Sequence, residues 1–248
     1  VDDSPVDGFN DGDVNKNNLL DPGEIWLFVA SGTATAGQYT NIGTATGRYE
    51  GQTVTASDPA NYYGGVSGIS LTKTTNGEDA NIAPGPGIVV GSSVTWRYEV
   101  RNTGNTPVRD LAVIDDQGVV VLPVDTAPAD GYNDGDVNKD HLLDVSEIWY
   151  YEGTGVAQLG QYANIGTATG VDDFTGQPVD SSDPSHYFGA TPGVSIIKRT
   201  NGEDANLPPG PTIVPGASVL WQYVISNTGN VPLDAVNVTD SDPAVRPI

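Results

Sequence analysis

The amino-acid sequence predicts an all-β protein of β-sandwich architecture, with no substantial helix. Apolar and polar residues alternate with a period of two in several short runs. Gly, Pro, Asn and Asp fill the gaps between these runs, and no stretch has the sustained period of an amphipathic helix. About seven short strands within roughly 120 residues are typical of a sandwich.

Five runs give the clearest strands. Between Ser93 and Arg101 the apolar residues occupy every second position, which indicates a half-buried strand of an antiparallel sheet. The same alternation predicts strands at Ile69–Lys73, Val108–Asp115, Ile148–Val156 and Ile165–Thr169. A strand-like run also spans Ile25–Val29.

The chain contains two periods of one repeat. Asp7–Asn15 returns almost unchanged as Asp130–Asn138, so positions 7 and 130 are 123 residues apart. Asn41–Gly47 returns identically at the same offset, whereas Asn76–Asn81 returns 125 residues later as 201–206. The two extra residues fall in one loop. Four tryptophans recur once per repeat within strand-like runs, so we expect core positions for Trp26, Trp96, Trp149 and Trp221.

The repeat divides the chain into three parts. Residues 1–65 are the C-terminal half of one repeat, residues 66–189 a complete repeat, and residues 190–248 the N-terminal half of the next. We expect short Gly-rich junctions around Asp58–Gly65 and Asp183–Gly189. The chain has no methionine, so we expect a segment of a longer or processed protein. Either the array continues along one polypeptide, or each subunit completes its neighbour's domain.

Composition excludes several functions. The chain has 32 Asp and Glu against 10 Lys and Arg, a net charge of −22. We therefore expect it to bind neither nucleic acid nor anionic membranes, and no apolar run is long enough to span a bilayer. The chain has no cysteine, which excludes disulfides and favours a prokaryotic surface protein. His141 and His186 are the only histidines and no repeated serine accompanies them, so we expect no enzyme.

Two acidic loops have the ligand spacing of a twelve-residue EF-hand-type calcium loop. Oxygen-bearing side chains occupy loop positions 1, 3, 5, 9 and 12, position 7 offers a backbone carbonyl, and position 8 is apolar. Calcium prefers such oxygen ligands. The predicted ligands are Asp13, Asn15, Asn17, Leu19, Asp21 and Glu24 in the first copy, and Asp136, Asn138, Asp140, Leu142, Asp144 and Glu147 in the second.

The loops depart from the usual pattern at position 6, where Asn18 and His141 replace glycine. Both residue types tolerate a left-handed backbone better than most, so the turn stays feasible. Strand-like runs follow both loops directly, so we predict calcium loops inserted in a sandwich. The alternative is a solvated acidic loop, because turns also favour Asp, Asn and Gly.

A second group of acidic and amide residues is a weaker candidate metal site near the expected junctions, where calcium would stiffen a hinge. A polar loop with ordinary turn chemistry is the equal alternative. The candidate residues are Asp58, Glu78, Asp79, Asn81, Asp183, Glu203, Asp204 and Asn206.

Several segments resemble a known family. The pattern of the immunoglobulin-like "conserved repeat" domain is followed by Lys73–Asn81, Pro84-Gly85-Pro86, Gly91–Val108 and Leu20–Glu24. That family occurs in tandem in very large bacterial and archaeal surface proteins. The resemblance covers nearly the whole period and implies a cell-surface location with a structural or adhesive role.

Related surface sandwiches sometimes carry a self-formed amide between a first-strand lysine and a last-strand asparagine, assisted by a buried acid. By strand position the resemblance makes Lys73 and Asn164 candidates, with Asp115 as the acid. The sequence itself favours a plainer interpretation, a surface lysine and a turn asparagine.

The function that these observations predict is a calcium-stabilised structural repeat of an extracellular filament, stalk or adhesin. Its partners are neighbouring copies of the same repeat, in a tandem array or a homopolymer that completes split domains between subunits. The alternative is a ligand- or carbohydrate-binding module accessory to a secreted protein, for which Tyr62, Tyr63, Tyr187 and Phe188 would supply the aromatic surface.

Overall fold

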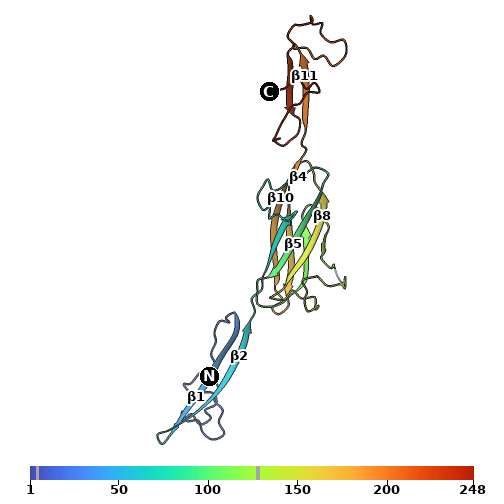
Figure 1. Ribbon diagram of the computed structural model, residues 1–248. Coiled ribbons are helices and arrows are strands. Elements are labelled where there is room, and N and C mark those ends of the chain that lie inside the picture. Colours follow the sequence, from blue (N-terminus) through green and yellow to red (C-terminus); the bar gives the residue numbers. More distant parts are fainter. Residues whose placement is uncertain (4–5, 127–128) are drawn as a thin grey trace. The chain divides into compact units, whose positions relative to one another are not determined.

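A computed structural model describes residues 1–248 except 4–5 and 127–128 (Figure 1). The described residues contain twelve strands and no helix, so the all-β prediction is confirmed. Consequently, this part of the chain has no helix that could cross a membrane. The chain divides into two compact units, Val1–Gly64 and Gly65–Ile248.

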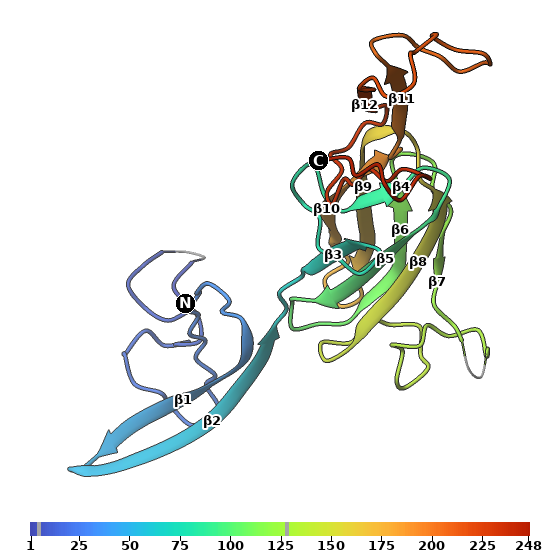
Figure 2. The same ribbon diagram turned by 45° about the horizontal axis from the view of Figure 1, so that its top comes forward.

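Within the second unit, residues 66–189 form two four-stranded sheets, which we call the central sandwich (Figure 2). One sheet is antiparallel and has the order β3 (Ile69–Thr75), β5 (Ser93–Asn102), β8 (Ile148–Val156), β7 (Val121–Pro123). The other is mixed and has the order β4 (Gly87–Val89), β10 (Pro178–Ala190), β9 (Gly160–Asp172), β6 (Val108–Asp115). All five clearest predicted strands are present.

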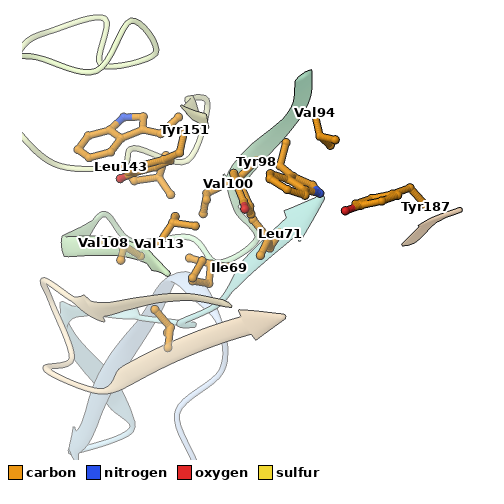
Figure 3. Packing of buried hydrophobic residues seen from close by; sticks show 14 of the residues in the cluster. Ile69, Leu71, Val94, Tyr98, Val100, Val108, Val113, Leu143, Tyr151 and Tyr187 are labelled. Carbon is orange, nitrogen blue, oxygen red and sulfur yellow. The ribbon is translucent and has the colours of Figure 1, made fainter. Parts of the chain in front are cut away.

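The core of the central sandwich lies between the two sheets. Along β5, alternate residues are buried from Val94 to Asn102, as the period-two pattern predicts. Tyr98, Val100 and Leu71 lie close together in Figure 3, with Val108 and Val113 from the second sheet nearby. Trp96 and Trp149 are buried in the same cluster, so the core prediction is confirmed for these two tryptophans.

Polar side chains of β10 tie the two sheets together along the edge of β3. The backbone N–H groups of Leu71 and Lys73 donate to Ser181 Oγ at 3.0 Å and Asp183 Oδ2 at 2.7 Å. The Thr75 and Ser185 hydroxyls also hydrogen-bond. An edge strand normally exposes such donors, so these contacts satisfy groups that would otherwise need water.

The two ends of the chain form hairpins that copy parts of the central sandwich. In the first unit, β1 (Gly37–Tyr49) pairs antiparallel with β2 (Gln52–Gly64), and Tyr39 faces Tyr62 as Tyr162 faces Tyr187. Near the other end, β11 (Val194–Thr200) pairs with β12 (Trp221–Asn227), and Lys198 faces Tyr223 as Lys73 faces Tyr98. The terminal hairpins thus have the same strand pairing and register as the matching segments of the central sandwich.

Two expectations about secondary structure are wrong. The segments expected to be Gly-rich junctions, Asp58–Gly65 and Asp183–Gly189, lie almost wholly within β2 and β10, although the division between the two compact units does fall after Gly64. Cross-strand pairing, including the Tyr162–Tyr187 ring stack at 4.5 Å, outweighs the turn signal of Gly and Pro there. The run Ile25–Val29 forms no strand, because its counterpart β8 pairs with β5 and β7, and residues 1–64 contain no equivalent of either.

Candidate functional site: two acidic loops and a buried lysine cluster

The acidic loop Asp136–Glu147 lies between β7 and β8 and is wound by its own carboxylates. Asp136 is buried, and its two oxygens accept from the N–H groups of Asp140 at 3.2 Å and His141 at 2.9 Å. At the other end, Glu147 accepts from the N–H groups of Val137 at 2.8 Å and Asp144 at 3.2 Å. The first and last ligand positions therefore hold the loop in a closed turn.

The backbone of this loop has the strain expected at position 6. His141 has φ 65° and Lys139, at position 4, has φ 61°. Asn18 and Lys16 take the same conformation in the first copy, both at φ 58°. Asn18 and His141 thus adopt the left-handed backbone that the sequence left feasible at position 6, and each such residue costs about 1–3 kcal/mol in general.

The side chains at positions 3, 5 and 9 are brought together. Asn138 Nδ2 donates to Asp140 Oδ2 at 3.0 Å and to Asp144 Oδ2 at 2.9 Å. Burial raises the pKa of Asp144, and the nearby carboxylates of Asp140 and Glu147 raise it further. Like charges are therefore concentrated in this loop, and a cation would relieve their repulsion.

The donor set fits calcium by its chemistry. Every predicted side-chain ligand offers oxygen, and turning the Asn138 amide over would direct its oxygen toward Asp140 and Asp144 with no change of backbone. In the part of the chain that the structure describes, no group of three or more His, Cys, Asp or Glu side chains is already arranged around one metal position. A bound ion would therefore draw the side chains inward.

The first loop, Asp13–Glu24, repeats these contacts. Asp13 accepts from the N–H groups of Asn17 at 3.1 Å and Asn18 at 2.7 Å, and Glu24 accepts from Val14 at 2.9 Å. Asn15 Nδ2 lies 2.7 Å from Asp21 Oδ2, as Asn138 does from Asp144. Because this copy belongs to a half-repeat, the loop conformation depends on local sequence and not on a complete sandwich.

The apolar residue at position 8 connects the second loop to the core. Leu143 has no exposed surface, and its N–H and C=O bond the backbone of Val108 at 2.8 Å and 3.1 Å. The Asn102 amide also donates to the Leu143 carbonyl at 2.9 Å. In the first copy Leu20 is 64% exposed. Loop and sandwich are therefore mechanically linked only in the complete repeat.

The second group of predicted metal ligands is not gathered into one site. Burial raises the pKa of Asp183, Asp79 raises it further, and the Lys73 N–H bond lowers it. Most of the others are exposed: Asp58 in β2, Glu78 and Asn81 after β3, and Glu203, Asp204 and Asn206 after β11.

Lys73, Asp115 and Asn164 meet in the interior of the central sandwich. Lys73 Nζ lies 2.7 Å from Asp115 Oδ2, and Asn164 Nδ2 lies 3.0 Å and 2.9 Å from the two Asp115 oxygens. The Lys73 and Asp115 side chains are fully buried and Asn164 is 1% exposed. The interpretation of a surface lysine and a turn asparagine is therefore wrong, because β3 and β9 direct both side chains inward.

A fourth residue completes this group, which we call the lysine cluster: Lys73, Asp115, Asn164 and Tyr98. The Tyr98 hydroxyl donates to Asp115 Oδ2 at 2.8 Å. Burial lowers the pKa of Lys73, although Asp115 acts against that, and burial raises the pKa of Tyr98. The carbonyl oxygen of the buried Asn164 amide has no hydrogen-bond partner among the described residues. The cluster thus holds an amine with weakened basicity beside an unsatisfied amide carbonyl.

The C-terminal half-repeat carries most of a second lysine cluster. Lys198 Nζ lies 2.6 Å from Asp240 Oδ2, and the Tyr223 hydroxyl also donates to Asp240. These residues match Lys73, Asp115 and Tyr98 at the offset of 125. The match of Asn164 is Asn41, an exposed residue of β1. Sequence reasoning missed Tyr98 and the second cluster, although the repeat offsets locate all its members.

The first unit contains an open apolar groove of about 1110 Å³ between the β1–β2 hairpin and the segment after the first acidic loop. Its lining includes Leu20, Trp26, Phe28 and Val54. Their matches in the complete repeat are Leu143, Trp149, Tyr151 and Val179, all of them core residues. The groove is thus one side of a sandwich core without its other side.

A comparison with models of known protein families gives no match, and a comparison with curated proteins gives none either. The central sandwich serves as the reference, because it shows how each segment of the two half-repeats packs when its partner strands are present.

Proposed function

We propose that this chain is a calcium-stabilised structural repeat of an extracellular surface filament, stalk or adhesin, and that copies join by completing each other's split immunoglobulin-like domains. One observation carries the proposal. The two half-repeats expose the faces that the same sequence buries in the central sandwich. Two such faces on one molecule favour a head-to-tail contact, which builds an open filament when the rotation between successive copies does not close a ring.

Burial at matched positions supports this assembly. Phe28 is 77% exposed in the first half-repeat, whereas its match Tyr151 is 6% exposed. Ile196 is 57% exposed in the C-terminal half-repeat, whereas its match Leu71 is 7% exposed. Exposed apolar surface of this extent marks an interaction site. Each half-repeat therefore offers an apolar face that could cover the exposed face of the other.

The strands that the half-repeats lack point to the same partner. β6 pairs with β9 in the central sandwich. Its match, residues 233–240, forms no strand, and the match of β9 is β1 in the other half-repeat. Likewise, residues 25–33 match β8, whose partner β5 has its match in β12. In both cases, the missing pairing would join the C-terminal half-repeat to the first unit.

Glycines in the first unit fit a close-packed partner. A Cβ at Gly166 would meet Tyr98 at 2.7 Å, and one at Gly170 would meet Val108 at 2.6 Å. Glycine is therefore required at both positions in the complete repeat. Their matches Gly43 and Gly47 would meet no atom of an opposite sheet. Gly43 and Gly47 therefore leave the space that the opposite sheet of a second copy would occupy.

Calcium suits the structural role. The net charge of −22 opposes association of copies, and cations in the two acidic loops would reduce it. An ion that binds only the folded form stabilises it by mass action, and extracellular calcium at about millimolar concentration suffices for weak loops. The link between Leu143 and Val108 carries that stabilisation from the loop to the core.

The alternative of a ligand-binding module gains little support. The exposed Tyr39 and the half-buried Tyr62 stack at 4.7 Å, which would suit a sugar ring. Its match, Tyr162 and Tyr187, stacks at 4.5 Å beside Trp96 in the complete repeat. Assembly therefore accounts for the aromatic pair, as it does for the rest of the exposed face.

Sedimentation velocity of the full chain at increasing protein concentration tests the proposal. We expect concentration-dependent, open-ended assembly in calcium, and weaker assembly together with a lower melting temperature in chelator. Glu147→Gln should remove calcium from the complete repeat while leaving the Glu24 loop intact, with metal content measured alongside. A monomer at all concentrations in calcium would overturn the assembly. A melt that chelator does not change, with no bound metal, would overturn the role of calcium.

A further inference from the structure

The lysine cluster has the components of an amide-forming reaction. Lys73 supplies an amine, Asn164 a primary amide, and Asp115 contacts both, at 2.7 Å from Nζ and at 2.9 Å from Nδ2 through the same oxygen. The group is inaccessible to solvent, so water does not compete with the amine. The unpartnered Asn164 carbonyl oxygen is free to accept a proton.

The reaction balances without any added reagent. The Lys73 ammonium gives a proton to the Asp115 carboxylate, and the neutral Nζ attacks Asn164 Cγ. The protonated Asp115 then returns a proton to the departing nitrogen as the C–N bond of the primary amide breaks, and its carboxylate takes up the second proton that Nζ loses on becoming an amide nitrogen. One new amide bond joins Nζ to Cγ, one molecule of ammonia leaves, and nothing is oxidised or reduced. Tyr98 holds the Asp115 oxygen that shuttles the proton.

The second lysine cluster is divided between the two half-repeats. Lys198, Tyr223 and Asp240 are already together on the C-terminal half-repeat, and only the asparagine is absent. Asn41 is exposed on β1, and it faces Ala60 of β2 as Asn164 faces Ser185 of β10. In the proposed assembly, β1 of one copy packs against residues 190–248 of another copy, in the way that β9 packs against β3 and β6. Asn41 then reaches the position that Asn164 has in the central sandwich.

We infer that Lys198 of one copy forms an amide bond with Asn41 of a second copy, with Asp240 as the proton shuttle and ammonia as the product. This inference depends on the proposed assembly, since the reactive groups meet only when the split sandwich is complete. The bond would make a head-to-tail filament covalent, and the same chemistry at Lys73 and Asn164 would lock each complete repeat.

The side chain of Lys198 is 43% exposed, whereas that of Lys73 has no exposed surface. An exposed amine stays protonated at neutral pH, and the contact with Asp240 raises the pKa of Lys198. The isolated hairpin is therefore unreactive. Burial by the second copy changes the surroundings of Lys198 to those of Lys73, so that bond formation follows docking.

Denaturing gel electrophoresis and intact mass spectrometry of the full chain, incubated at high concentration in calcium, test this inference. We expect a ladder of multimers that survives heating in detergent, with each new link lowering the summed mass by one ammonia. Proteolysis should release a branched peptide joining the segments that contain Lys198 and Asn41. The monomer should already lack one ammonia, from Lys73 and Asn164.

Variants separate covalent linkage from assembly. Lys198→Arg keeps a cation beside Asp240 but cannot form the bond, so we expect assembly by sedimentation without a ladder. Asn41→Ala should give the same result, and the substitution Arg97→Lys at an exposed position of β5 should leave the ladder intact. Assembly of the unaltered chain without a ladder would overturn the amide bond and leave the proposed function standing. A chain that does not assemble would overturn both, and a ladder that persists in Lys198→Arg would overturn this assignment of its residues.

Discussion

The hairpins β1–β2 and β9–β10 have nearly the same sequence and register but opposite burial. Tyr39 pairs with Tyr62 and Tyr162 with Tyr187, and the pairing continues in step along both hairpins. Alternate residues of β9 are buried from Asn164 to Asp172, whereas almost every residue of β1 is exposed. Strand pairing in this repeat is therefore a local property of the sequence, and burial comes from the opposite sheet.

The difference in burial also predicts which regions of the chain are stable by themselves. Isolated two-stranded hairpins are marginal in water, because they bury too little apolar surface to offset chain entropy. The half-repeats should accordingly gain most of their stability on assembly, whereas the central sandwich has its own core.

The largest difference is expected at loop position 8. Leu143→Ala removes a side chain with no exposed surface, so the free energy of unfolding of the central sandwich should fall by about 2–5 kcal/mol. Leu20→Ala removes a 64% exposed side chain and should change the stability of the monomer very little. Denaturant unfolding of dilute chain measures both. Equal losses at the two positions would contradict the different burial of the two regions.

A smaller effect is expected from filling space that an opposite sheet occupies. In Gly166→Ala the new Cβ would meet Tyr98 at 2.7 Å, so overpacking should destabilise the central sandwich by about 1–3 kcal/mol. Gly43→Ala should leave the monomer's unfolding unchanged but weaken assembly, because its clash arises only with Tyr223 of a second copy. Chemical unfolding and sedimentation report the two effects separately. Normal assembly of Gly43→Ala would show that copies do not pack as the central sandwich does.

Much of this organisation could be predicted from the sequence. Period-two alternation located the five clearest strands, and the internal offsets identified which segments are copies. The loop spacing singled out Asp136 and Glu147, whose contacts close the loop. These features depend on neighbours in the sequence or on simple recurrence, which one chain displays fully.

What the sequence did not reveal depends on packing between distant segments. Lys73, Asp115 and Asn164 lie on three strands from both sheets, and the sequence favoured a surface position for the lysine. Lysine is rarely buried, so composition argues against such a site until the opposing Asp115 is placed. The expected junction at Asp183 failed for a similar reason, because its carboxylate binds the backbone of β3.

The smallest expected effect concerns the turn in which the two hairpins differ. Asp172, the last residue of β9 before this turn, is buried and accepts from the Thr175 N–H at 2.6 Å, from the Thr175 hydroxyl and from the Thr106 hydroxyl. Burial alone would raise its pKa, but these hydrogen bonds together lower it below 3.8. The β1–β2 turn has Tyr49 at the matched position.

A carboxyl group with a lowered folded pKa stabilises the fold above its unfolded pKa and loses that contribution as pH falls through the folded value. The unfolding free energy of the central sandwich should therefore decline below about pH 4. Asp172→Asn should lower stability at neutral pH and flatten this decline. Unfolding curves of the unaltered chain and of Asp172→Asn from pH 6 to pH 2 measure the difference in stability between them. The raised pKa of Asp183 affects both proteins equally, so its contribution is absent from that difference. Parallel pH profiles would show that the Asp172 carboxylate does not hold this turn to the sandwich.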